Sequence, residues 1–149
     1  MKILIINGPN LNLLGSREAE HYGTHSLEDI QKLTDQRLSS ISSEIKTSWI
    51  QSNIEGEIVT FIQDAANQYD GIVINPGGYS HTSVSILDAL KIFKGTKVEV
   101  HLSKLTSRKD LYRQKMITAE GVDILLEGLL DLSYFIGVFS IYSRLKPKG

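Results

Sequence analysis

Cysteine is absent from this chain of 149 residues. Its absence excludes disulfides, thiolate catalysis and zinc sites built on cysteine. Long hydrophobic runs are missing too, since no stretch approaches the ~18 consecutive apolar residues of a membrane span. The apolar run at the N-terminus stops at Asn7, which does not fit the plan of a signal peptide. We therefore expect a soluble, cytoplasmic protein that has no membrane partner.

The chain also lacks an excess of charge of either sign. Its 16 basic and 17 acidic side chains leave a formal net charge of −1, which gives no electrostatic reason to expect nucleic acid as a partner. Neither a Gly-x-Gly-x-x-Gly pattern nor a Walker loop is present. His21 and His25 have the spacing of a helical metal pair, but Gly23 lies between them and disfavours a helix there. The sequence thus favours a small, polar, hydroxylated ligand over a nucleotide, and no metal site is predicted.

Short β-rich runs alternate with helical patterns along the chain, which is typical of a parallel sheet with crossover helices. The length and the hydrophobic content of 41% are those of one domain, residues 1–149, built around one core. We predict an α/β fold with a flavodoxin-like, doubly wound, five-stranded parallel sheet. The expected strands are Lys2–Asn7, Lys46–Ser52, Gly71–Asn75, Thr96–Leu102 and Val122–Glu127, and the expected helices are one capped by Ser26, Glu55–Gln68, Thr82–Phe93, one beginning near Ser107 and Asp131–Arg144.

The connection after the first expected strand is unusually long. Roughly eighteen residues separate Asn7 from the next helix signal at Ser26, whereas βα loops usually have about 2–6 residues. A long loop at the carboxyl end of a strand is typical of a functional lid. Within it, Arg17 lies near Tyr22, and a guanidinium beside a phenol favours the phenolate, which can act as a base. On spacing alone, an exposed tyrosine beside an unrelated arginine is the simpler interpretation.

Polar side chains also follow the third expected strand. In the loop 75–83, two glycines allow the backbone to approach a ligand closely, and Asn75 and His81 place hydrogen-bonding groups at its two ends. We interpret this loop as part of a binding site. The alternative is a glycine turn in which Ser80 or Thr82 only caps the next helix.

The run from Val98 to Ser103 alternates strictly, so Glu99 and His101 point to the same face of their strand. A carboxylate in that position can hold the imidazole in one tautomer and favour its protonated form, which makes His101 a candidate general acid. The alternative is a structural pair at the end of a strand.

Together these segments resemble the type II 3-dehydroquinate dehydratases. The resemblance covers roughly the first 110 residues. It implies the cofactor-free dehydration of 3-dehydroquinate to 3-dehydroshikimate through an enolate, in the shikimate or quinate pathway, by a homo-oligomer of trimers assembled into a dodecamer. The resemblance is carried by Ile6–Gly15, Arg17–Glu18, Tyr22–Gly23, Gln51–Glu57, Ile74–Ser83 and Val98–Ser103.

The resemblance also implies a role for each matching residue. Tyr22, held as tyrosinate by Arg17, would remove a proton from C2 of the substrate. His101, supported by Glu99, would protonate the departing C1 hydroxyl, and Asn12 would help to position the water that stabilises the enolate. The residues implied to bind substrate are Asn75, His81, Ser103, the backbone at Leu102, and Asp88 reaching in from a neighbouring subunit.

The chain departs from the family's pattern where a second substrate-binding arginine is expected. Tyr112 stands at that position and Arg113 follows it. On the helix expected there, one residue is a rotation of ~100°, so Arg113 could bind substrate only from a shifted helix or with a bent side chain. A flavodoxin-like module that binds a polyol or carboxylate without converting it is therefore the main alternative. The presence of the expected acid and base together favours the enzyme.

Overall fold

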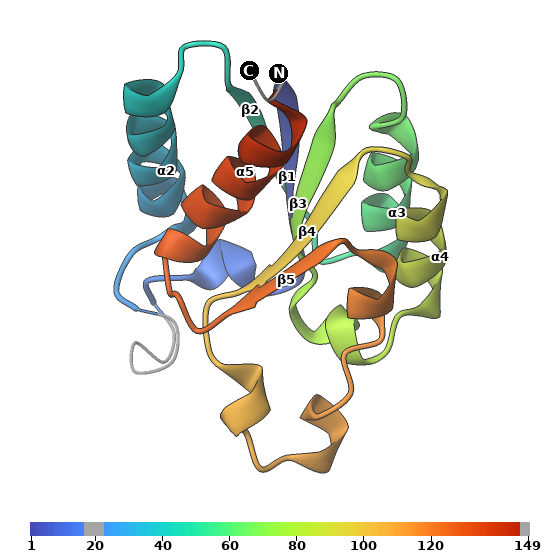
Figure 1. Cartoon of the computed structure of the whole chain (residues 1–149). Helices are drawn as coiled ribbons and strands as arrows, with labels where there is room; N and C mark the ends of the chain where they lie inside the picture. Colours follow the sequence, from blue (N-terminus) through green and yellow to red (C-terminus); the bar gives the residue numbers. More distant parts are fainter. Residues whose placement is uncertain (17–22, 147–149) are drawn as a thin grey trace.

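The computed structural model describes residues 1–16 and 23–146. At its centre is a sheet of five parallel strands in the order β2-β1-β3-β4-β5 (Figure 1). This is the strand order of flavodoxin-type sheets, so the predicted fold class is confirmed. The first and third predicted strands have the predicted ends, and the others are one or two residues shorter. The strands are β1 (Lys2–Asn7), β2 (Lys46–Gln51), β3 (Gly71–Asn75), β4 (Thr96–His101) and β5 (Ile124–Glu127).

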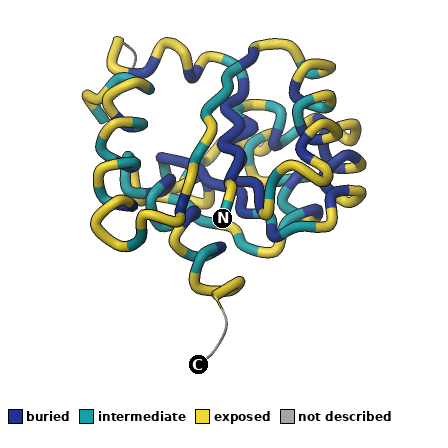
Figure 2. Tube along the Cα trace, turned by 90° about the horizontal axis from the view of Figure 1, so that it is seen from above, coloured by how far each residue is buried: buried dark blue, intermediate teal, exposed yellow. Residues whose placement is uncertain are grey.

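Helices cover both faces of the sheet. Helices α2 (Leu27–Ile41) and α5 (Leu132–Leu145) lie on one face, and α3 (Glu55–Asp64) and α4 (Val84–Ile92) lie on the other (Figure 1). Successive residues of β1 point alternately into the two cores that result. Every residue of its apolar run is therefore buried, as Figure 2 shows for the central strands.

Helix α2 begins as the sequence predicts. The Ser26 hydroxyl accepts a hydrogen bond from the Asp29 amide at 3.1 Å, and the Asp29 carboxylate accepts one from the Ser26 amide at 3.0 Å. This capping box satisfies amide groups that the first turn of a helix leaves unpaired. It fixes the point at which the long loop after β1 enters the helix.

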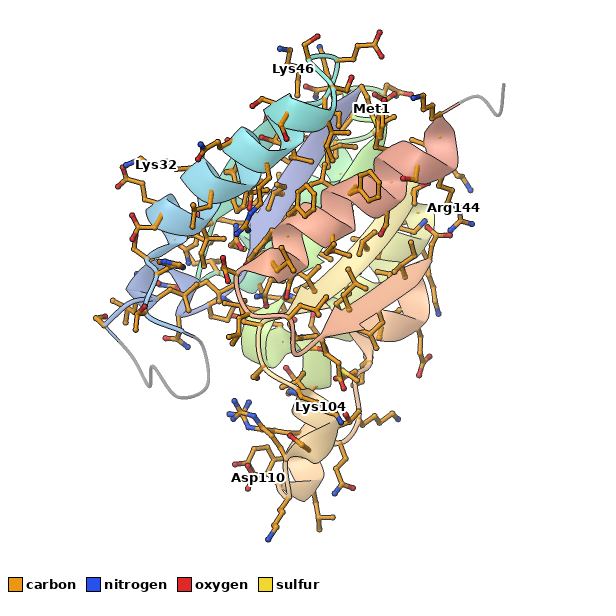
Figure 3. The ribbon with its side chains drawn as sticks, turned by 60° about the vertical axis from the view of Figure 1, so that its left-hand side comes forward. Met1, Lys32, Lys46, Lys104, Asp110 and Arg144 are labelled. Carbon is orange, nitrogen blue, oxygen red and sulfur yellow. The ribbon has the colours of Figure 1, made fainter. Side chains whose placement is uncertain are left out.

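The prediction of a helix that begins near Ser107 is wrong. The segment between β4 and β5 instead forms three short 3-10 turns, η3 (Leu105–Ser107), η4 (Leu111–Arg113) and η5 (Thr118–Gly121). Its middle part has no apolar face to pack, since Leu111 and Tyr112 are 81% and 69% exposed. A short helix without tertiary packing is marginal in water. The segment therefore extends beyond the sheet, where Lys104 and Asp110 lie in Figure 3.

The helix after β3 begins later than predicted for a similar local reason. Residues Gly77–His81 form the 3-10 turn η2, and Ser83 caps α4 by accepting a hydrogen bond from the Ile86 amide at 2.9 Å. Neither Ser80 nor Thr82 is the cap. The hydroxyl of Ser80 is thereby left for another role, described below.

The carboxyl ends of β1 and β3 meet at the centre of the sheet, where Asn7 and Asn75 pair in register. β2 lies on one side of β1 and the next strand, β3, lies on the other, so the direction in which successive strands extend the sheet reverses at β1. Sheets of this type bind their ligands at that reversal point. Gly8 allows the two loops to touch, because a Cβ at this position would lie 2.5 Å from the Pro76 carbonyl oxygen. Among the described residues, no helix has both the length and the apolarity that crossing a bilayer requires.

Candidate active site

A cavity of about 120 Å³ lies at the carboxyl edge of the sheet. Its walls come from the loops after β1, β3 and β4 and from the turn η4. The structure thus brings together most of the residues that the sequence predicts to contact substrate, although they lie far apart along the chain. Those that line the cavity are Asn75, His81, His101, Leu102, Ser103 and Arg113.

The other predicted residues fall into two groups. Tyr22 and Arg17 fall outside the described residues. Asn12 is exposed in the turn η1 (Leu11–Leu13), and Asp88 is exposed on α4. Neither belongs to the wall of the cavity. Glu99 lies behind His101 and does not line the cavity either.

His101 is buried at the end of β4 and bonded to Glu99. The distance between His101 Nε2 and Glu99 Oε1 is 2.7 Å, and the two residues are 4% and 0% exposed. Since an ionised carboxylate can only accept, Nε2 donates in this bond. Any proton that His101 gives to a ligand in the cavity must therefore come from Nδ1.

Glu99 accepts hydrogen bonds at both of its carboxylate oxygens. Ser80 Oγ donates to Oε1 at 2.7 Å, the same oxygen that His101 contacts, and Thr118 Oγ1 donates to Oε2 at 2.7 Å. Both hydroxyl residues are fully buried. Sequence reasoning missed this cluster, because Ser80 and Thr118 are each 19 positions from Glu99 and belong to different elements.

His81 and Asn75 are also held in fixed orientations. His81 Nδ1 lies 2.7 Å from the carbonyl oxygen of Lys115, so Nδ1 carries the proton and Nε2 is left as an acceptor for a ligand hydroxyl. Asn75 Nδ2 donates to the phenol oxygen of Tyr134 at 3.2 Å, and Asn75 Oδ1 accepts from the Gly77 amide at 3.2 Å. The second N–H of the Asn75 amide remains for a ligand.

Tyr134 extends the hydrogen bonds of Asn75 into the core. It is completely buried on α5, and its phenol donates to Asn7 Oδ1 at 2.6 Å. Burial raises the pKa of Tyr134 well above its usual range. The phenol therefore stays protonated, donates to one asparagine and accepts from the other.

Arg113 reaches the cavity from η4, whereas Tyr112 does not line it and is 69% exposed. Arg113 does not have the helical rotation that the sequence predicts, because residues Leu111–Arg113 form a 3-10 turn. The guanidinium carbon of Arg113 lies 5.6 Å from the centre of the Tyr112 ring, and Nε lies 3.8 Å from Asp110 Oδ2. Within the described part of the chain, Nε is buried and has no hydrogen-bond partner.

Comparisons with known proteins agree with this geometry. A model of the family "Dehydroquinase class II" matches residues 1–142. The chain belongs to the class II dehydroquinase family. A relative from Bartonella henselae named 3-dehydroquinate dehydratase is 44% identical over 144 residues, which are 97% of this chain and 95% of the relative. Another of that name from Clostridium acetobutylicum is 45% identical over 145 residues, 97% of this chain and 99% of the relative.

Solved structures show the same family. The type II dehydroquinase from Butyrivibrio crossotus superimposes with a TM-score of 0.90 at 38% identity, covering 95% of this chain and 97% of the other. The match to the class II dehydroquinase family therefore covers nearly the whole chain, including the 3-10 segment that contains Tyr112. The resemblance first recognised in its N-terminal part is thus confirmed and extended.

Proposed function

We propose that this protein is a 3-dehydroquinate dehydratase, a hydro-lyase that converts 3-dehydroquinate to 3-dehydroshikimate and water in the shikimate or quinate pathway. Family membership and the names of its relatives support this function. The observation that carries it is the buried His101–Glu99 pair at the wall of a cavity that Asn75 and His81 also line. That arrangement supplies an acid and polar binding groups in one place.

In the proposed reaction, Tyr22 in its phenolate form removes the C2 proton, and the electron pair moves into the ketone to form an enolate. Arg17 stabilises the phenolate, and Asn12 helps to position a water that stabilises the enolate. When the enolate collapses, the bond between C1 and its hydroxyl oxygen breaks, and Nδ1 of His101 protonates that oxygen. Water leaves, and the chemistry requires an acid, a base and an oxyanion stabiliser but no cofactor or metal.

We assign substrate binding to side chains of the cavity. The Arg113 guanidinium would hold the substrate carboxylate, since planar guanidinium groups bind carboxylates in pairs of charge-assisted hydrogen bonds. His81 Nε2 would accept from a substrate hydroxyl, and the free N–H of Asn75 would donate to another. Ser103 and the backbone of Leu102 would complete the contacts on the side of β4.

We further propose that the protein acts in the cytoplasm as trimers assembled into a dodecamer, with residues 1–149 as one catalytic domain in each subunit. Asp88 would then complete the site of a neighbour. Its surroundings support a subunit contact, because Val84 and Ile92, one turn before and one turn after it on α4, are 56% and 66% exposed. Apolar side chains exposed around one carboxylate fit a face that a second subunit covers.

The deciding experiment follows absorbance at the enone band after 3-dehydroquinate is added to purified protein in EDTA without cofactor. A catalytic rise that His101→Ala abolishes is the expected result. A flat trace, together with calorimetry showing that folded protein binds the substrate, would overturn the dehydratase in favour of a polyol- or carboxylate-binding module. Light scattering on the same sample measures the proposed dodecamer independently.

A further inference from the structure

We propose that Ser80 and Thr118 are positioning residues for the general acid. Their hydroxyls fix the plane of the Glu99 carboxylate, and Glu99 in turn aims the His101 ring at the leaving hydroxyl. This inference rests on the proposed function, in which His101 protonates that group.

Three hydrogen-bond donors hold the Glu99 carboxylate in one orientation. Oε1 accepts from both Ser80 and His101 at 2.7 Å, and Oε2 accepts from Thr118 at 2.7 Å. The last torsion of a glutamate side chain is soft, so it is these donors that set the angle. A carboxylate buried without them would turn to satisfy its oxygens elsewhere, because an unpaired buried charge is strongly unfavourable.

The segments that carry the two hydroxyls are joined by a backbone hydrogen bond that does not involve Glu99. The amide of Ile117 donates to the carbonyl of Ser80 at 2.7 Å, which docks η5 onto η2. Thr118 Oγ1 then lies 3.3 Å from Ser80 Oγ. The groups that orient Glu99 are therefore also held by contacts with one another, independent of the carboxylate.

Neither hydroxyl lines the cavity. A substrate in the cavity would contact His101 but not Ser80 or Thr118, so these residues can influence the reaction only through Glu99. This separates an effect on protonation, which appears in kcat, from an effect on binding, which appears in KM.

The principal test is Thr118→Val, which removes the hydroxyl and keeps the shape of the side chain. We expect kcat to fall about 10- to 100-fold, because a small displacement of a catalytic group lowers the rate strongly. This loss is a part of the ~10²–10⁴-fold that a general acid contributes. KM should stay within about twofold, since no substrate contact is lost. Thr118→Ser keeps the donor and should retain most of the wild-type kcat.

A double-mutant cycle with Glu99→Gln distinguishes positioning from a general structural effect. If Thr118 acts through the carboxylate, Thr118→Val should lower kcat much less in the Glu99→Gln background than in the wild type. Equal losses in both backgrounds would overturn the proposal, as would a wild-type kcat in Thr118→Val. Ser80→Ala provides a second, independent variant should Thr118→Val fail to fold, and the same cycle applies to it.

Failure of this proposal differs from failure of the proposed function. If the wild-type protein does not dehydrate 3-dehydroquinate, the proposed function fails before any variant is made. If the wild type is active and the cycle shows independent effects, the function stands and the positioning role of Ser80 and Thr118 is wrong.

Discussion

The buried phenol of Tyr134 accepts a hydrogen bond from the side-chain amide of Asn75 at 3.2 Å. The same phenol donates to Asn7, so one residue of α5 joins the ends of the two central strands. Asn75 lines the cavity, whereas Tyr134 does not. The orientation of a substrate-binding group is thus set from inside the core.

Tyr134→Phe should weaken both folding and substrate binding. It removes one hydroxyl from a buried site and leaves Asn7 Oδ1 without its donor, which costs about 1–3 kcal/mol of unfolding free energy. Freed from the phenol, the Asn75 amide can rotate, and we expect KM to rise about 3- to 10-fold, the value of one hydrogen bond. Urea unfolding and steady-state kinetics measure the two effects. Tyr142→Phe, on the same helix but only half-buried, should change neither, and an unchanged KM in Tyr134→Phe would limit Tyr134 to a structural role.

Tyr22→Phe should lower kcat by about 10²–10⁴-fold, because it deletes the group that we propose as the base. Substrate affinity should change much less, since the ring remains. Steady-state kinetics and calorimetric binding of substrate separate the two quantities. The matched control is Tyr112→Phe, since the Tyr112 phenol is 69% exposed and does not line the cavity. Wild-type turnover in Tyr22→Phe would remove this residue from the mechanism.

His101→Ala should lower kcat by a similar factor but at a different step. The base remains, so the enolate can form and return to substrate without losing its hydroxyl. Partial reaction in D₂O should therefore introduce deuterium at C2 of unconverted 3-dehydroquinate, and NMR of the recovered substrate measures it. Retained turnover would show that another group supplies the proton.

Borohydride treatment tests the class of chemistry. A dehydratase that used a Schiff base would be inactivated by borohydride in the presence of substrate, because reduction traps the lysine adduct. The proposed enolate mechanism forms no such adduct, and activity should survive the treatment. Loss of activity with a mass increase on a lysine would contradict the mechanism.

The strands could be predicted from the sequence because each carries its own signal. β1 and β3 are buried on both faces, so an uninterrupted apolar run marks their limits. The pairing of Glu99 with His101 was equally local, since alternation along one strand places both on one face. These features depend only on neighbours in the sequence.

Features set by distant contacts could not be read in the same way. Tyr134 lies 127 positions from Asn7, and no local pattern relates them. A helix was expected after β4, but only the tertiary structure shows that Leu111 is 81% exposed. With Tyr112 at the family's arginine position, the sequence allows Arg113 to bind substrate only from a shifted helix or with a bent side chain. The turn η4 changes that inference by directing Arg113 into the cavity.

Arg113→Ala should therefore raise KM and leave kcat much less affected. Hydrogen bonds to charged groups contribute about 1.5–3 kcal/mol, which corresponds to a KM increase of about 10- to 100-fold. Arg113→Lys keeps the charge but loses the planar pair of donors, so its KM should lie between those of the alanine variant and the wild type. Lys109→Ala removes a positive charge from the same segment at an exposed position outside the cavity. If Lys109→Ala raises KM as much as Arg113→Ala does, the effect is one of general electrostatic attraction, and Arg113 is not the carboxylate-binding residue.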